Sequence, residues 1–182
     1  MSVFHSNTEM LIDYWRSLTF GSGPPPRGLL DPGEFAPLAP QVFLLGRERA
    51  GRYPFRLTGE FVRDLFGQDL RGRSLLSLFR YPDAWPLRTA MEAARRFPEP
   101  LVMLAQGTTA SASIGLEILL APLSGGTTGP DRFLGLLQPL SQVWVLQGEP
   151  VTEITLGGLT SAGGVRQVPR LKLAALDGRR IA

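Results

Sequence analysis

The first apolar pattern in the chain has the period of a helix. Its apolar positions recur at i, i+3, i+4 and i+7, and a capping-box sequence, Ser6 to Glu9, precedes them. Three consecutive prolines in the segment from Gly21 to Gly28 supply no backbone donors and favour an extended chain. The pattern therefore predicts an N-terminal helix followed by a linker. The predicted apolar stripe consists of Leu11, Tyr14, Trp15 and Leu18.

The next two segments have the pattern of strands. Val42 to Leu45 is a short, continuous apolar run. After the segment from Gly46 to Arg52, apolar and other residues alternate, which is the period of a strand with one buried face. We expect two strands joined by a hairpin loop. The alternating positions of the second strand are Tyr53, Phe55 and Leu57.

The period becomes helical again after the second strand. Glu60 to Phe66 has an apolar face, and Gly67 follows it where a glycine commonly ends a helix. Asp83 is the candidate N-cap of a longer helix that runs to Phe97, and the prolines beyond that residue prevent its continuation. We expect these helices to lie between the second and third strands.

Three further apolar segments, separated by loop-forming residues, predict an antiparallel meander. Beyond Gln138 the pattern weakens: Val143 to Leu146 either extends a strand or packs on the core, and the last residues are only weakly periodic. We divide the chain into a helix and linker (1–28), one domain (29–147) and a C-terminal tail (148–182). The three strand segments are Leu101 to Ala105, Ile114 to Ala121 and Phe133 to Leu137.

The order of these elements defines a fold class. Five antiparallel strands, with the helices gathered between the second and third, fit an α+β domain. Its sheet would carry helices on one face, with the N-terminal helix flanking it. This order of elements resembles that of a PAS domain.

Particular stretches of sequence add to this resemblance. They are similar to a small PAS-type family found in alphaproteobacteria, which includes motility-linked single-domain PAS proteins. The similarity extends from about His5 to Phe79, and the later strands agree in order only. It implies a five-stranded PAS sheet and a signalling role without a known ligand. The stretches are His5 to Arg16, Leu38 to Leu45, Phe55 to Gly59, Asp64 to Gly67 and Leu70 to Ser74.

The chain has no cysteine and a single histidine, His5. Thiolate metal sites and the cysteinyl–flavin adduct of PAS-type photosensors are therefore excluded. One histidine cannot form a multi-histidine metal site. The helix from Asp83 to Phe97 also lacks the axial histidine that haem-binding PAS domains generally use. We expect no metal site and no histidine-ligated haem, read His5 as a polar residue near a helix N-cap, and leave the cofactor unknown.

The charge is mildly positive, with 19 basic and 16 acidic residues and a net charge of +3. Nucleic-acid-binding proteins carry clustered basic stripes, and the only basic cluster here is in the tail. No apolar run approaches the roughly 18 residues that a membrane span needs, and the first twenty residues lack the pattern of a signal peptide. We expect a cytoplasmic protein. The tail cluster is Arg166, Arg170, Lys172, Arg179 and Arg180.

Two groups of residues are candidates for binding. Most apolar residues facing a predicted helix–sheet interface only fill a core, although such a position is also where a small apolar ligand would bind. The N-terminal helix must pack either on its own sheet or on a second copy, because an isolated helix of this length is marginal in water. The pocket candidates are Phe55, Phe61, Leu65, Phe66, Phe79, Met91, Met103 and Leu116; the dimer or partner candidates are Leu11, Trp15, Leu18 and Arg56.

These observations favour a non-enzymatic sensory or regulatory module that acts through a protein partner, and that also has room for a small ligand. The chain has no space for an effector domain, so its output would pass through another protein. Two other classes stay open. A nucleic-acid-binding protein would use the Arg-rich tail and show steeply salt-dependent binding. An enzyme would need polar groups in the pocket, whereas the inward positions are nearly all apolar.

Overall fold

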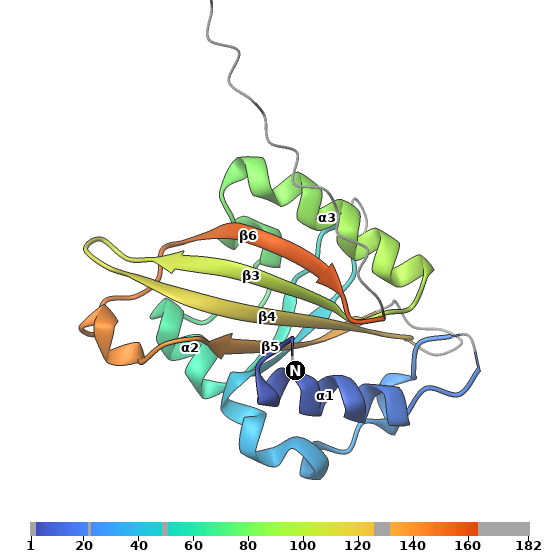
Figure 1. Ribbon diagram of the computed structural model, residues 1–182. Coiled ribbons are helices and arrows are strands. Elements are labelled where there is room, and N and C mark those ends of the chain that lie inside the picture. Colours follow the sequence, from blue (N-terminus) through green and yellow to red (C-terminus); the bar gives the residue numbers. More distant parts are fainter. Residues whose placement is uncertain (1–2, 22, 49–50, 126–131, 164–182) are drawn as a thin grey trace, which may run out of the picture.

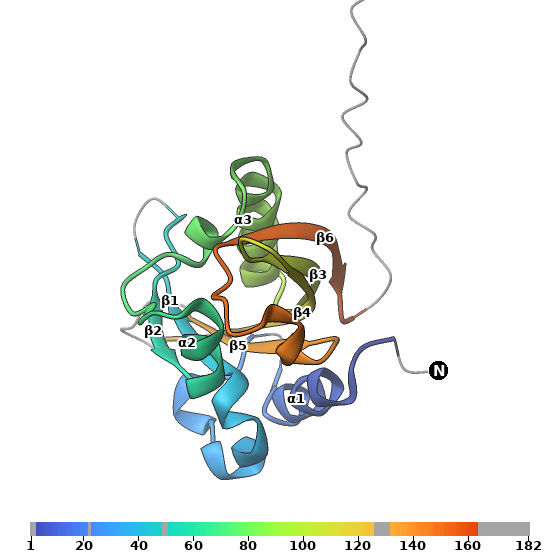
Figure 2. The same cartoon turned by 90° about the vertical axis from the view of Figure 1, so that its left-hand side faces the viewer.

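The computed structural model describes residues 3–21, 23–48, 51–125 and 132–163. The described chain forms one antiparallel sheet of six strands, in the order β2-β1-β5-β4-β3-β6, with helices on both faces (Figures 1 and 2). The strands are β1 (Val42–Gly46), β2 (Phe55–Thr58), β3 (Leu101–Thr108), β4 (Ser113–Leu123), β5 (Arg132–Pro139) and β6 (Glu153–Ser161). The helices are α1 (Ser6–Ser17), α2 (Glu60–Phe66) and α3 (Tyr81–Arg96), with 3-10 segments η1 (Arg27–Leu29), η2 (Pro32–Gln41), η4 (Leu75–Leu78) and η5 (Val143–Leu146).

The α+β class and the antiparallel sheet are confirmed, but the sheet has six strands and not five. The sixth, β6, lies in the segment 148–182 that we expected to be a tail, and it pairs with β3 along the whole length of that strand. Two apolar residues of β6, Leu156 and Leu159, pack against the inner core. They are an odd number of positions apart because the register shifts opposite Leu104 and Ala105. This shift breaks the period-2 pattern by which a strand is recognised.

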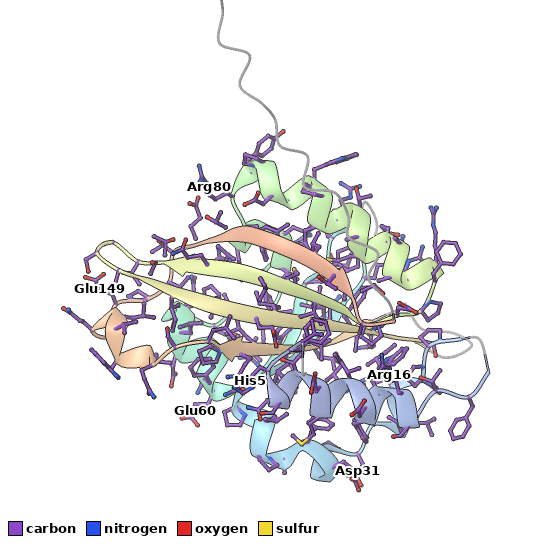
Figure 3. All side chains as sticks on the ribbon, viewed as in Figure 1. His5, Arg16, Asp31, Glu60, Arg80 and Glu149 are labelled. Atoms are coloured by element: carbon purple, nitrogen blue, oxygen red, sulfur yellow. The ribbon has the colours of Figure 1, made fainter. Side chains whose placement is uncertain are left out.

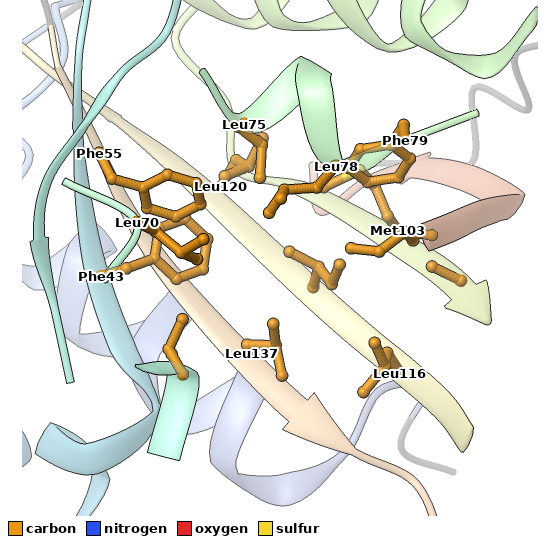
Figure 4. Packing of buried hydrophobic residues seen from close by; sticks show 14 of the residues in the cluster. Phe43, Phe55, Leu70, Leu75, Leu78, Phe79, Met103, Leu116, Leu120 and Leu137 are labelled. Carbon is orange, nitrogen blue, oxygen red and sulfur yellow. The ribbon is translucent and has the colours of Figure 1, made fainter. Parts of the chain in front are cut away.

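Each face of the sheet carries its own apolar core. We call the face covered by α2 and α3 the inner face, and the face covered by α1 and η2 the outer face (Figures 1 and 2). The expectation that helices lie on one face is therefore corrected, because α1 and η2 pack on the opposite side. Figure 4 shows the inner core, in which side chains from the hairpin and from η4 meet those of the central strands.

A β-bulge at Arg56 changes which face the second strand presents. Phe55 lies opposite Leu45 and belongs to the inner core, whereas Leu57 lies opposite Leu44, an outer-face residue. The extra residue turns the strand by one position, so two residues that should share a face are on different faces. Leu57 is consequently 52% exposed on the outer side, and the prediction that it belongs to the buried face is wrong.

Several local signals had the predicted effect, and others acted differently. α2 spans Glu60–Phe66 and ends at Gly67, whose φ of +61° is the left-handed conformation expected of a C-terminal glycine. α1 is capped by the His5 imidazole, which accepts from the Asn7 backbone N–H, and not by Ser6. Asp83 lies inside α3 and accepts from the Leu156 N–H of β6, so it joins α3 to the sheet edge.

The centre of the inner face depends on a glycine in β5. Gly135 lies directly opposite Phe43 of β1, and a Cβ atom at this position would come within 2.1 Å of the Phe43 ring. The Phe43 ring in turn packs against Phe55, with 5.4 Å between the ring centroids. The missing side chain at residue 135 therefore makes room for the aromatic pair that joins the hairpin to the sheet.

Candidate functional site

The predicted pocket residues do come together, as part of the inner core. Figure 4 shows Phe55, Phe79, Met103 and Leu116 in this core. Seven of the eight are buried, with exposed fractions of 6% or less, and Phe61 packs against them from its partly buried position. Close packing of this kind is what a core needs for stability. The assignment of these residues to one cluster is correct, while their role in binding a ligand stays a prediction. The buried seven are Phe55, Leu65, Phe66, Phe79, Met91, Met103 and Leu116.

At the edge of this core, a charged cluster joins the hairpin to α3. The Tyr53 hydroxyl donates to the Glu92 carboxylate, and Arg47 and Arg95 lie 3.3 Å and 3.2 Å from its two oxygens. Burial, followed by the hydrogen bond to Glu92, raises the pKa of Tyr53 above its usual value. Burial also raises the pKa of Glu92, but Tyr53 and the two arginines outweigh that effect and lower it overall.

Glu92→Gln is expected to lower the free energy of unfolding by about 2 kcal/mol at pH 7, since hydrogen bonds to a charged group are lost. The folded-state pKa of Glu92 lies below the unfolded value, so its stabilisation is present above about pH 4.3 and disappears as the pH falls through the folded pKa. Denaturant unfolding of both proteins from pH 3 to pH 7 should show the difference narrowing at low pH. Glu34→Gln, at an exposed glutamate, is the charge-matched control. If the unfolding free energies of the wild type and Glu92→Gln differed equally at pH 3 and pH 7, the lowered folded-state pKa of Glu92 would be contradicted.

The outer face holds a groove of about 640 Å³. Its floor is the sheet itself, at Val42 and Leu44 of β1 and Leu134 of β5. Phe35 and Ala39 of η2 line it on one side, and Leu57 lines it because the bulge directs that side chain outward. The complete lining is Pro26, Arg27, Gly28, Leu30, Pro32, Phe35, Ala39, Val42, Leu44, Leu57, Ser124, Gly125, Arg132 and Leu134.

The proline-rich linker supplies a further wall of the groove. Its backbone is attached to the end of β4 by two hydrogen bonds, from Ser124 N–H to the Pro25 carbonyl and from Arg27 N–H to the Ser124 carbonyl. η2 is held in turn by α1, because the Asp31 backbone N–H donates to the Tyr14 hydroxyl at 2.7 Å. The predicted linker and η2 thus enclose an apolar space on the sheet.

Two arginines give this groove a positive rim. Arg27 comes from η1 and Arg132 begins β5, and among the described residues that line the groove none is acidic. Neither guanidinium forms an ion pair within the described chain. Partial burial, followed by the positive charges of Arg27 and Arg56, lowers the pKa of Arg132. These arginines were not predicted from the sequence.

The apolar stripe of α1 packs on its own sheet, the intramolecular alternative considered above. Leu11 and Trp15 are buried in the outer core, and the Trp15 indole N–H donates to the Pro122 carbonyl at 2.7 Å. Leu18 is half-buried. Leu11 and Trp15 are therefore core residues of this chain and present little surface to a second copy, and the homodimer itself stays a prediction.

The first turn of α1 is attached to the only charged and amide side chains buried in the described part of the sheet. The His5 backbone N–H donates to Glu117 at 3.0 Å, and the Asn7 side chain donates to Gln138 at 2.9 Å. Glu117 and Gln138 are paired neighbours on β4 and β5. Figure 3 shows His5 at this end of α1 and Arg16 at the other. His5 thus has the structural role expected for it, at the helix N-cap.

Arg56, the remaining partner candidate, forms an ion pair with Glu48 at 2.9 Å, and its side chain is 44% exposed. An ion pair was one of the two roles considered for it, and its exposed part leaves partner contact as a prediction.

The Arg-rich tail, from Arg166 to Arg180, lies outside the described residues, as does part of the Gly46 to Arg52 loop.

Two general features concern metals and membranes. Among the described residues, no group of three or more histidine, cysteine or acidic side chains is placed to hold a metal ion. No helix in the described chain is long and apolar enough to cross a bilayer. Neither the inner core nor the outer groove shows a constellation that identifies a reaction.

The six-stranded antiparallel sheet, with a helical layer on the inner face and a helix across the outer one, defines an α+β domain of the PAS type. The chain belongs to the PAS domain family, whose sequence model matches residues 3–138. Domains of this family are generally sensory or regulatory modules. Among curated proteins, none matches this chain.

Similar solved structures include two proteins of the light-oxygen-voltage (LOV) type. The Rhodobacter sphaeroides LOV protein is 18% identical, with a TM-score of 0.45 over 63% of this chain and 70% of that chain. An RNA-binding light-oxygen-voltage receptor is also 18% identical, with a TM-score of 0.45 over 65% of this chain and 37% of its own. Similarity at this level bears on neither the ligand nor the partner of this protein.

Proposed function

We propose that this protein is a non-enzymatic sensory or regulatory PAS module of bacterial signal transduction that acts by binding a partner protein. Membership of the PAS domain family supports the class of function. The proposal of a partner is supported by one observation, an apolar area on the outer face of the sheet that is exposed in the described part of the chain.

This area lies beside α1, which packs on β4 and β5. Leu104, in the middle of β3, is 52% exposed on this face. Leu140, 47% exposed, lies over Gly115 of β4, which is paired with Gln106 of β3. Single exposed apolar residues are common, but neighbouring ones on an open sheet face are typical of an interaction surface.

The chemistry of this area favours a protein over a nucleic acid. No arginine or lysine lies on β3 or β6, both of which the structure describes in full. On β3 and β6 the outward positions beside Leu104 are uncharged, with Gln106 on β3 and Thr155 and Thr160 on β6. The β4 neighbour of Leu104 is Glu117, which is acidic and buried. Binding a phosphate backbone requires positive charge, whereas the centre of a protein interface is poor in charge.

Leu104→Arg is expected to abolish partner binding without unfolding the domain, because the side chain already projects into solvent. Chemical cross-linking in the native cell, followed by mass spectrometry, would identify proteins attached to the wild type and lost from the variant. Binding of the purified partner would then be measured directly, with a loss of at least tenfold expected. Phe97→Arg is the matched control, since Phe97 is 76% exposed at the end of α3, which packs on the inner face. Partner binding that withstands Leu104→Arg, or that Phe97→Arg weakens equally, would contradict the proposal.

A further inference from the structure

The groove on the outer face combines two properties that a packed surface seldom has together. It is a hollow of about 640 Å³, within the usual range of small-molecule sites, with an apolar floor formed by Val42, Leu44 and Leu134. Its rim carries two guanidinium groups, Arg27 and Arg132, that have no acidic partner in the described chain. An apolar floor with an unneutralised positive rim complements a molecule that is apolar along its length and negative at one end.

We propose that this groove binds an anionic amphiphile, an apolar molecule with a carboxylate head, whose head is held by Arg132 and Arg27 and whose body lies on the sheet between η2 and the linker. The proposal goes beyond the partner surface at Leu104 and depends on none of its residues. It also assigns the ligand to the outer face, and not to the inner core where sequence analysis placed the candidates.

The position of Arg132 makes it the principal contact for the head. In β5 the outer face is occupied by Leu134 and Leu136, and Arg132 has the same parity, so it stands on the same face as the apolar floor. It is partly buried, and this burial, followed by the positive charges of Arg27 and Arg56, lowers its pKa. An anion at the rim would favour its charged form. The flat fork of N–H groups in arginine fits the two oxygens of a carboxylate.

Nearby ion pairs leave the rim charge in place. Arg56 lies close enough to influence Arg132, but its own charge is already paired with Glu48 at 2.9 Å. Asp31 lies next to the lining residue Pro32, and its carboxylate accepts from the Gly33 N–H at 2.8 Å and caps η2. Among the described residues that line the groove, the charged side chains are therefore Arg27 and Arg132.

The apolar part of the groove arises from three features of the fold. The bulge at Arg56 directs Leu57 outward, η2 brings Phe35, and the linker is fastened along the end of β4 through Ser124. Each feature comes from a different part of the chain, and together they leave apolar surface uncovered where a fully packed sheet would bury it. A hydrocarbon body in the groove would remove this apolar surface from water, which favours binding.

The test uses dodecanoate as the probe, titrated below its micelle concentration into the full chain and followed by calorimetry and by backbone amide NMR shifts. Binding is expected to shift the amides of Leu44, Leu57 and Leu134 and to leave those of Met103 and Leu116 unchanged. Dodecanol, which has the same body without the charge, is expected to bind at least tenfold more weakly. Shifts confined to Met103 and Leu116, or equal affinity for the alcohol, would overturn the proposal.

Two arginine variants separate the head from the body. Arg132→Gln is expected to weaken dodecanoate about tenfold, because this side chain is partly buried, and Arg27→Gln about threefold, because an exposed ion pair contributes less. Neither should change the affinity for dodecanol. Arg63→Gln removes the same charge from α2 and should have no effect. Should Arg132→Gln fail to fold, the Arg27→Gln result decides, and a dodecanoate affinity unchanged by Arg27→Gln would overturn the proposal. If the wild-type protein does not bind dodecanoate but still binds its partner through the Leu104 surface, the ligand proposal is wrong and the proposed partner function stands.

Discussion

Trp15→Ala is expected to lower the free energy of unfolding by about 3–5 kcal/mol, the usual cost of deleting a large buried side chain. Trp15 is 4% exposed in the outer core, and its indole N–H is bonded to the Pro122 carbonyl. Removing it leaves a cavity between α1 and the sheet and an unpaired backbone carbonyl. Urea unfolding followed by far-ultraviolet circular dichroism gives the value without relying on tryptophan fluorescence.

Trp144→Ala is the matched control for this experiment. Trp144 is 75% exposed on η5, so its removal should change the unfolding free energy by no more than about 0.5 kcal/mol. If both substitutions had the same small effect, α1 would not be packed on the sheet in solution, and Trp15 would be free for the dimer contact that the sequence suggested.

Gly135→Ala is expected to cost about 3 kcal/mol, near the upper end for overpacking a core. The new methyl group would lie within 2.1 Å of the Phe43 ring, and that ring is buried against Phe55. The strain should be relieved by reducing the ring, so Gly135→Ala combined with Phe43→Leu is expected to be more stable than the sum of the two single effects predicts. Thermal and urea unfolding of the four proteins forms a double-mutant cycle with a positive coupling.

Gly158→Ala provides the control for the backbone change. Gly158 is also in a strand of the same sheet, and a Cβ at this position meets no atom within 4 Å. Its substitution should leave stability within about 0.5 kcal/mol of the wild type. A cost at residue 135 no larger than that at residue 158 would show that β1 and β5 are not in the register described.

Local signals in the sequence were sufficient where a single residue decides the structure. Gly67 ends α2 where predicted, because only a residue tolerant of positive φ fits at that point. The strand Glu153–Ser161 was missed because a bulge and two glycines break its alternation, and its pairing with β3 depends on residues some fifty positions earlier. Pattern arguments assume an uninterrupted period, and a bulge violates that assumption without a signal in the strand's own sequence.

The reliance on periodic patterns also explains which candidate site residues could be predicted from the sequence. The inner candidates were identified because apolar periodicity detects burial, whichever role the buried residue has. Arg27 and Arg132 are recognised only when the linker, β5 and η2 are brought together. One signal was available: Arg132, Leu134 and Leu136 alternate on one face, so an arginine was in line with core residues. The significance of Arg132 depended on knowing that the bulge at Arg56 places Leu57 in the lining of the same groove.

The attachment of α1 to the middle of the sheet has a consequence for the order of synthesis. The contacts that hold this helix are made with Glu117, Pro122 and Gln138, residues that follow it by more than a hundred positions. On the ribosome, α1 is therefore complete long before its binding surface exists, and its tryptophan has no place to be buried. Translation must reach the end of β5 before the helix can pack on the sheet, so until then the nascent chain carries α1 as an exposed apolar segment to which chaperones can bind.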